Sequence, residues 1–259
     1  MFGDLAIDHY PVGAVLISLT IAAAITLQLG LRRLLGADTI RDCHEVSGYY
    51  LSTVGAFYAV LLGLIVFDAM SRFQTADKTV DAEAKSILTI YSLSSQFPRQ
   101  EANIKDLTRR YLDDVIRNEW TLMEKNQMSP PAGKAILDLM EVIKTIEPET
   151  ENQKAIYPNI LSEMLSWRES RGERSRVANF EIPAVEWLVL ILGGGITIVF
   201  TFFFTLDRKA FQFAMTAMIT LMLSMSLYLI YLFGDPFSGD LKIHEDALVN
   251  VRKFVTEHP

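Results

Sequence analysis

The residues best suited to hold a metal ion are Cys43, His44 and Glu45, which are adjacent in the chain. Thiolate, imidazole and carboxylate groups are all ligands for transition metals. Consecutive residues on a helix, however, point about 100° apart and cannot converge on one ion. Because Cys43 is the only cysteine, an intrachain disulfide and a cysteine-based zinc or iron–sulfur centre are also excluded. We therefore predict no metal and no cofactor.

Motifs of soluble enzymes are absent from the sequence. It has no metalloprotease helix motif, no phosphate-binding Gly-Lys-Ser/Thr loop and no nucleophile elbow. Three consecutive glycines, Gly193 to Gly195, lie inside an apolar run, where small residues usually permit close helix packing. The histidines are scattered among loops and tails: His9, His44, His244 and His258. We predict that the protein is not an enzyme.

A ridge of small side chains is the most informative feature. Ser52, Gly55, Ala59 and Gly63 lie on nearly one face of a predicted helix. Such a face either permits close approach between helices or lines a narrow conduit near an oligomer axis. Asp68, at the end of this helix, either forms a polar ring at a pore mouth or marks the helix end at the membrane interface. The sequence leaves both pairs of alternatives open.

Composition predicts a chain divided between lipid and water. Half of the 259 residues are hydrophobic while 21% are charged, and the mean hydropathy is +0.23, so the two characters must occupy different segments. A net charge of −7 argues against a nucleic-acid partner, which requires a concentrated basic surface. The N-terminal segment carries Asp4 and Asp8 but no basic residue, and a long apolar run follows, so a cleaved signal peptide is not expected.

Four runs are long enough to cross a bilayer of roughly 30 Å as helices. Arg32 and Arg33 end the first run, and Glu186 is the only charged residue in the third. Four such runs would be very unusual in a soluble core. We predict an all-α integral membrane protein with four transmembrane helices in two hairpins, and the lipid bilayer as a partner. The runs are 12–31, 49–67, 183–206 and 210–233.

Between the two hairpins, residues 70–180 predict a helical extramembrane domain. Apolar residues recur at helical spacing, for example Val80, Ala84 and Ile87, and no alternating strand pattern occurs. Because no Gly/Ser linker separates the segments, we expect the helices through Asp68 and Arg176 to leave the bilayer without a hinge. The predicted parts are an N-terminal hairpin, the domain, a C-terminal hairpin and a tail: 1–69, 70–180, 181–234 and 235–259.

This arrangement places both termini and the domain on one side of the membrane. The side is left open, because basic residues occur both in the short connections, such as Arg32 and Arg208, and near the membrane ends of the domain, such as Arg72 and Arg174.

Several motifs together resemble the bacterial bestrophin-like family, long catalogued as a domain of unknown function. They are Gly55 to Gly63 (GAFYAVLLG), Val80 to Ala84 (VDAEA), Asn118-Glu119-Trp120, the arginine-rich segment Arg168 to Arg174, Ile182-Pro183 with Trp187, and Asp235 to Gly239 (DPFSG). The residues that carry the family motifs are Tyr58, Glu83, Glu119, Trp120, Arg168, Arg171, Pro183, Asp235, Pro236, Phe237 and Gly239.

The resemblance implies a layout like that of bestrophins, which are pentameric ion channels with cytoplasmic helical domains and pores lined by the second span. It therefore implies an oligomeric channel for small inorganic ions. It also implies a location in the cell membrane, namely the inner membrane of a bacterium. Candidate pore-lining residues are Ser52, Gly55, Ala59, Gly63 and Asp68. The alternative is a non-conducting membrane scaffold or sensor whose helical domain recruits partners.

Two further expectations concern the motif residues themselves. Glu83, Glu119, Arg168 and Arg171 carry opposite charges on helices that should lie side by side, so we expect them to pair within or between subunits. In the closing motif, we expect Asp235 to cap a turn, Pro236 to fix φ, Phe237 to anchor at the membrane interface and Gly239 to supply a permissive backbone.

Overall fold

The computed structural model describes the backbone of residues 7–35, 37–204 and 208–258, and the side chains of these residues except 35 and 37–46. The side chains of Cys43, His44 and Glu45, considered above as metal ligands, lie outside this description. The described ranges are almost entirely helical and contain no strand. The predicted all-α class is confirmed.

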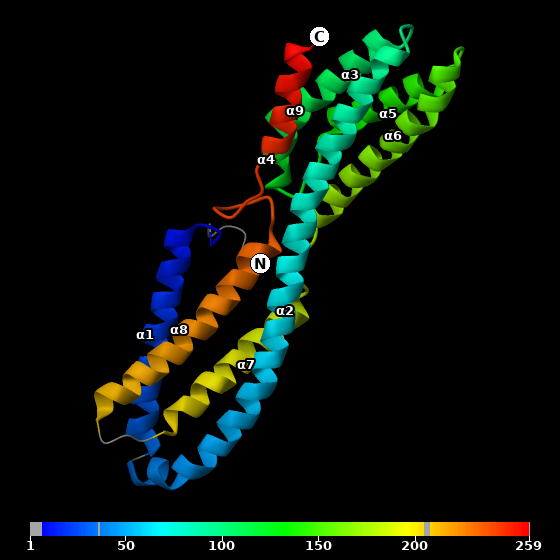
Figure 1. Cartoon of the computed structure of the whole chain (residues 1–259). Helices are drawn as coiled ribbons and strands as arrows, with labels where there is room; N and C mark the ends of the chain where they lie inside the picture. The colour runs from blue at the N-terminus through cyan, green and yellow to red at the C-terminus, as the bar shows by residue number, and fades with distance from the viewer. Residues whose placement is uncertain (1–6, 36, 205–207, 259) are drawn as a thin grey trace. The chain divides into compact units, whose positions relative to one another are not determined.

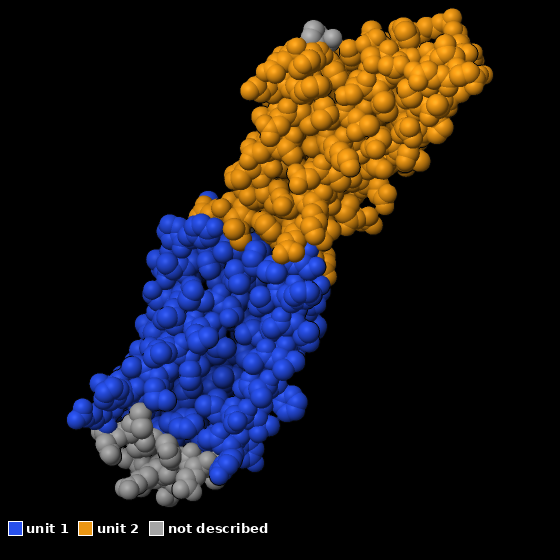
Figure 2. Space-filling view, viewed as in Figure 1, with its two compact units in different colours: residues 1–71, 181–234 blue, residues 72–180, 235–259 orange. Residues whose placement is uncertain are grey.

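The chain divides into two compact units, coloured separately in Figure 2. Unit 1 comprises Met1–Ser71 and Glu181–Gly234, and unit 2 comprises Arg72–Phe180 and Asp235–Pro259. The last 25 residues, expected as a separate tail, therefore pack with unit 2. Unit 1 holds α1 (Tyr10–Leu35), the first part of α2 (Ala37–Leu93), α7 (Ala184–Phe202) and α8 (Lys209–Gly234) (Figure 1).

All four predicted spans are present in the described part of the chain. Helices long and apolar enough to cross a membrane are Tyr10–Leu34, Ser47–Gln96, Ala184–Phe202 and Lys209–Gly234. Large apolar side chains such as Leu19, Phe57, Leu64 and Met222 are more than half exposed. In water such a surface would drive aggregation, whereas a bilayer solvates it. Unit 1 is therefore a membrane domain.

Glycines let the helices of unit 1 approach one another closely. A Cβ atom added at Gly13 of α1 would lie 2.1 Å from the ring of Tyr228 in α8, and one added at Gly193 of α7 would lie 2.4 Å from the ring of Tyr58 in α2. Small residues at helix contacts allow the van der Waals packing that replaces the hydrophobic effect in lipid. The helix α1 packs against α7 and α8, and α7 packs against α8.

Unit 2 contains the remainder of α2, the 3₁₀ turn η1 (Ser94–Gln96), α3 (Glu101–Asp114), the π-helical turn η2 (Val115–Glu119), α4 (Trp120–Met123), α5 (Pro130–Lys144), α6 (Glu151–Ala178) and α9 (Asp246–Glu257). Its helix starts carry strong local signals. Ser129 caps α5 ahead of Pro130, and Thr150 forms a capping box with Gln153 at the start of α6.

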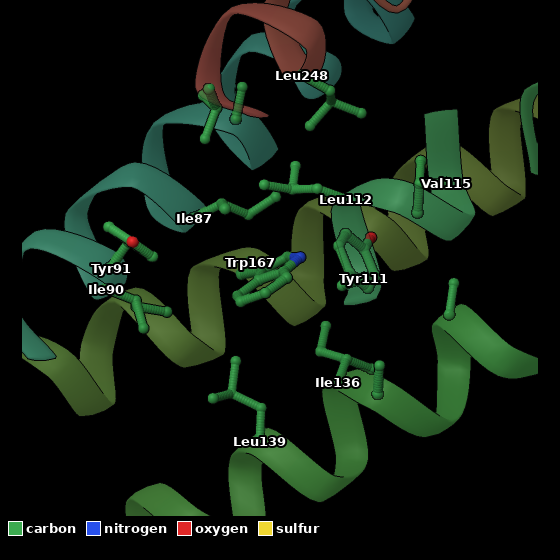
Figure 3. Close-up of a cluster of buried hydrophobic side chains, with 14 of the residues drawn as sticks. Ile87, Ile90, Tyr91, Tyr111, Leu112, Val115, Ile136, Leu139, Trp167 and Leu248 are labelled. Atoms are coloured by element: carbon green, nitrogen blue, oxygen red, sulfur yellow. The ribbon is translucent and has the colours of Figure 1, made fainter. Parts of the chain in front are cut away.

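The core of unit 2 is built around Trp167, which is fully buried (Figure 3). Its indole lies edge-on to the ring of Tyr111, with centroids 4.8 Å apart. Ile87 and Ile90 of α2 and Leu139 of α5 surround this pair. Leu248 of α9 belongs to the same cluster, which explains why the C-terminal residues pack with unit 2.

Of the two helices expected to continue without interruption, the one through Asp68 does so and the one through Arg176 does not. The helix α2 continues without interruption from Ala37 to Leu93 and so passes through Asp68. The helix through Arg176 ends at Ala178, and α7 begins only at Ala184. The break has a physical cause, since Pro183 lacks an amide N–H and disfavours helical backbone in the residue before it.

Candidate functional site

The small-residue face of α2 lies open in the chain. Ser52, Ala59 and Gly63 are exposed and Gly55 is half-buried, and a Cβ added at Gly55 or Gly63 would meet nothing within 4 Å. With about 100° per residue, the four residues fall within a sector of about 80°. Close packing within this chain therefore does not explain these glycines, in contrast to Gly193.

Asp68 does not share this face. It lies five residues beyond Gly63, which places it about 140° further around the helix. Asp68 is exposed and has an interaction with a neighbouring group. Four of the five candidate lining residues thus share one face of α2, and Asp68 lies on another side of the helix.

Tyr58 and Pro183 have structural positions in unit 1. The Tyr58 hydroxyl donates a hydrogen bond to the carbonyl oxygen of Leu190 at 2.8 Å, and its ring covers Gly193. Pro183 is the residue immediately before α7, with φ −54° and ψ 139°. Glu186 follows in the first turn, where the helix dipole favours a negative charge.

A network of charged side chains lies in the interior of unit 2. Glu83 of α2 and Arg174 of α6 are fully buried, and the Arg174 Nε donates to Glu83 Oε2 at 2.7 Å. Glu119 of η2 is also fully buried and accepts from Arg171 at 2.6 and 2.7 Å and from Arg174 at 2.8 Å. Two carboxylates and two guanidinium groups therefore neutralise one another in the core.

Neutral groups satisfy the remaining donors and acceptors of this network. The Tyr111 hydroxyl donates to Glu83 Oε1 and accepts from Arg171 at 3.2 Å. The Ser129 amide donates to Glu119 Oε2 at 2.8 Å. Arg174 also donates to Met123 Sδ at 2.8 Å, and its guanidinium lies 5.3 Å from the Trp120 ring centroid.

Contacts within the network determine the protonation states of Glu119 and Tyr111 near neutral pH. Burial by itself would raise the pKa of Glu119, but the hydrogen bond from Arg171 and the charges of Arg174 and Arg171 outweigh it and lower that pKa below the ordinary value. Burial, followed by the charge of Glu83, raises the pKa of Tyr111. Because Glu119 stays ionised and Tyr111 neutral, the arrangement is typical of a structural connection between α2, α3 and α6.

The predicted pairing of acids and arginines is correct in part. Glu119 and Arg171 do pair, whereas the buried partner of Glu83 is Arg174, which was not among the predicted site residues. Arg168 is exposed beside an open groove between α5 and α6, and it forms no ion pair with the described residues.

A sequence signal for Arg174 did exist. The buried positions of α6 are Ile160, Met164, Trp167, Arg171, Arg174 and Ala178, spaced by alternating steps of three and four. This is the spacing of one helix face, so the two arginines continue an apolar core stripe. Arg168 falls outside it.

The π-helical turn η2 determines how Glu119 enters the core. Glu119 and Trp120 are consecutive, yet both are buried, and the Trp120 amide donates to the carbonyl of Val115, five residues earlier. A π turn inserts one extra residue and rotates the following side chains, a feature frequent at functional positions. Helical spacing of apolar residues alone would not place both Glu119 and Trp120 in the core.

The closing motif also belongs to unit 2. Phe237 is fully buried and lies edge-on to Trp120, with centroids 5.8 Å apart. The expectation that Phe237 anchors at the membrane interface is therefore wrong, since Trp120 offers it an aromatic partner in the core. The Pro236 carbonyl accepts from the Ile243 amide at 2.8 Å. Gly239 has φ 72°, a conformation that glycine adopts without strain, and Asp235 begins the turn by accepting from the Ser238 amide through its carbonyl.

Comparison with known proteins identifies relatives over nearly the whole chain. A family model described as the Bestrophin-like domain matches residues 18–248. No protein in a curated set matches the sequence.

Solved structures share the fold at low sequence identity. A bacterial bestrophin homologue from Klebsiella pneumoniae, solved by zinc phasing, has a TM-score of 0.67 at 15% identity over 94% of this chain and 98% of that chain. Two single-substitution variants of the Klebsiella pneumoniae homologue have TM-scores of 0.71 and 0.69, at 14% and 15% identity. The first covers 94% of this chain and 97% of its own, and the second covers 93% and 96%.

Proposed function

The chain belongs to the bestrophin-like family, whose bestrophin relatives are ion channels, and we propose that it forms a homo-oligomeric channel for small inorganic ions with α2 lining the conduit. The lining residues in this proposal are Ser52, Gly55, Ala59 and Gly63. We also propose a bacterial inner membrane as the location, on the basis of the bacterial structural relatives.

The observation that carries the proposal is the open small-residue face. Glycine is costly in a helix, by about 1 kcal/mol relative to alanine, so a repeated use of small residues calls for a reason. At Gly193 the reason is the ring of Tyr58. At Gly55 and Gly63 an added Cβ would meet no side chain or other helix of the described residues within 4 Å. A partner helix or a conduit at an oligomer axis would supply the reason.

Ion flux is the direct test. The purified protein is reconstituted in liposomes, and flux of monovalent cations and anions is measured against empty vesicles over a range of pH and calcium concentration. Flux well above that of empty vesicles supports the channel. No flux under any of these conditions contradicts it and favours the alternative of a membrane scaffold or sensor.

Leucine substitutions test the lining. Gly55→Leu and Gly63→Leu should lower flux by about tenfold or more, because a bulky side chain narrows a conduit lined by small residues. Gly195→Leu is the matched control, since Gly195 is also an exposed glycine in a membrane helix with nothing within 4 Å of an added Cβ. It should retain flux.

The mass of the oligomer, measured by light scattering in detergent, distinguishes a small-residue face that lines a conduit from one that packs subunits together. A conduit predicts that Gly63→Leu changes flux while the oligomer keeps its mass. If Gly55→Leu and Gly63→Leu dissociate the oligomer while Gly195→Leu does not, the face packs subunits together, as the scaffold alternative requires. If flux and mass are both unchanged, α2 does not line the conduit through this face.

A further inference from the structure

Polar side chains are buried where α1, α7 and α8 pack against one another in unit 1. Besides Gln28 of α1, they are Thr197 and Thr201 of α7 and Gln212, Thr216 and Thr220 of α8. The residues of each helix are four or eight positions apart, which places them on one face. The hydroxyls of Thr201 and Thr216 lie 3.3 Å apart across the contact. None of these buried polar residues is acidic.

Gln28 is the exceptional member of this group. It is 0% exposed, and both its amide nitrogen and its amide oxygen lack a hydrogen-bond partner in the described part of the chain. The hydroxyls of Thr197, Thr201 and Thr220 donate to backbone carbonyls of their own helices, but the Gln28 side chain has no such bond to the described residues. A buried amide without a partner is expensive, and more so in a membrane domain that excludes water.

Arg32 lies one helical turn from Gln28 on the same face of α1. Its guanidinium donates to the carbonyl oxygen of Phe204 at 2.9 Å and to the side-chain oxygen of Gln212. Both partners are neutral. The Arg32 Nε is buried and makes no hydrogen bond to the described residues. Arg32 is partly buried, its guanidinium is always charged, and no ion pair joins it to a carboxylate of the described residues, so an anion there would be stabilised by its charge.

We propose that Gln28 and Arg32 bind a small monovalent anion, of the size of chloride, bromide or nitrate, between α1, α7 and α8. The Arg32 Nε and the Gln28 amide nitrogen are N–H donors whose hydrogens have no acceptor, and side chains in a helix tilt toward the preceding turn, which directs Arg32 toward Gln28. An anion would accept from both groups and neutralise the guanidinium. Cations are disfavoured because the charge present is positive and none of the described residues buried there is acidic.

This site is independent of the proposed conduit. Gln28 and Arg32 belong to α1, whereas the proposed lining belongs to α2. The anion would hold α1 to the ends of α7 and α8, because Arg32 already contacts Phe204 and Gln212. Anion binding therefore does not require that the protein conduct ions, and a failed flux experiment would leave this inference standing.

Halide-dependent stability tests the site on the full-length protein in detergent. Tm is measured while sodium gluconate is replaced by sodium bromide at constant ionic strength. We expect a saturable rise in Tm, because a ligand that binds the folded state stabilises it by mass action. The rise should disappear in Arg32→Gln and in Gln28→Leu, and it should remain in Arg33→Gln, a control on the adjacent, exposed arginine.

Gln28→Leu keeps the test decisive if Arg32→Gln does not fold. Leucine replaces an unpartnered amide by an apolar group, so this variant should be at least as stable as the wild type in gluconate. With bromide, the wild type should gain stability and Gln28→Leu should not. Bromide anomalous scattering from crystals should then show one peak between Gln28 and Arg32.

Three results would overturn the inference. One is a Tm that responds equally to gluconate and bromide. Another is a bromide response that survives in both Arg32→Gln and Gln28→Leu. The third is density at the site for water or for a lipid phosphate group, accompanied by no anomalous bromide signal.

Discussion

Unit 1 and unit 2 differ in which side chains they expose and in how their buried polar groups are paired. Nearly all large apolar side chains that are exposed in the described residues lie in unit 1, whereas unit 2 contributes only Leu137, Leu165, Val249 and Phe254. Unit 2 buries four charges and pairs all of them. Unit 1 buries neutral polar groups, among which the Gln28 amide has no hydrogen-bond partner in the described residues. The difference shows that the surrounding solvent, lipid or water, determines which residues face outward. The packing of the helices determines which buried polar groups find hydrogen-bond partners.

The largest effect should follow from removing one charge of the unit 2 network. Arg174→Met leaves Glu83 as a buried carboxylate without a cation, and loss of one partner of a buried pair costs about 3–5 kcal/mol. Hydrogen exchange of the full-length protein should show this loss in α6 and in the unit 2 part of α2. Arg176→Met, which removes an exposed pair with Glu173, should change the same amides by less than about 1 kcal/mol. Equal effects of the two variants would mean that the network adds nothing to stability.

A steric change should destabilise unit 1 by a smaller amount. Gly193→Ala places a Cβ 2.4 Å from Cδ2 of Tyr58, and overpacking of this kind costs about 1–3 kcal/mol. Gly195→Ala meets nothing within 4 Å and should be neutral or slightly stabilising, because alanine is the better helix former. The measurement is the detergent-dependent unfolding midpoint followed by Trp187 fluorescence in a Trp120→Phe, Trp167→Phe background. A neutral Gly193→Ala would show that α2 and α7 separate readily.

Low pH should reduce the stability of unit 2 because it protonates Glu119. Its pKa is lowered in the folded state, so its contribution to stability is fully present above the ordinary pKa of 4.5 and is lost as pH falls from there through the folded pKa. Hydrogen exchange of α3 and α6 between neutral and acidic pH measures this loss. Glu119→Gln should be less stable at neutral pH but should lose less on acidification. Parallel pH profiles for the two proteins would contradict the assigned role of Glu119.

The smallest effect should come from a hydrogen bond in unit 1. Tyr58→Phe removes the bond to the Leu190 carbonyl, and such bonds between membrane helices contribute about 0.6 kcal/mol on average. The loss is small because the carbonyl lies within α7 and keeps its helical hydrogen bond. Tyr50→Phe, at an exposed position, is the control and should have no effect. A loss comparable to that of Arg174→Met would show that unit 1 also depends on a buried polar contact.

Much of the fold could be predicted from local patterns. An uncharged run of about twenty residues suffices to predict a span, because the bilayer imposes one requirement on every residue within it. The predicted helical stripe of Val80, Ala84 and Ile87 likewise identified a buried face of unit 2. The break before α7 was not predicted. The absence of a Gly/Ser linker does not keep a helix continuous, whereas Pro183 interrupts it locally.

The sequence by itself thus determined the number of spans, the helical class and the small-residue face, since each depends on residues close together in the chain. Only the tertiary structure decided that Glu83 pairs with Arg174, 91 positions away, that Phe237 lies in the core beside Trp120, and that Gln28 is buried without a partner. These outcomes depend on how distant helices pack and on the π turn at Val115–Glu119, and hydropathy, which is a sum along the chain, contains no information about either.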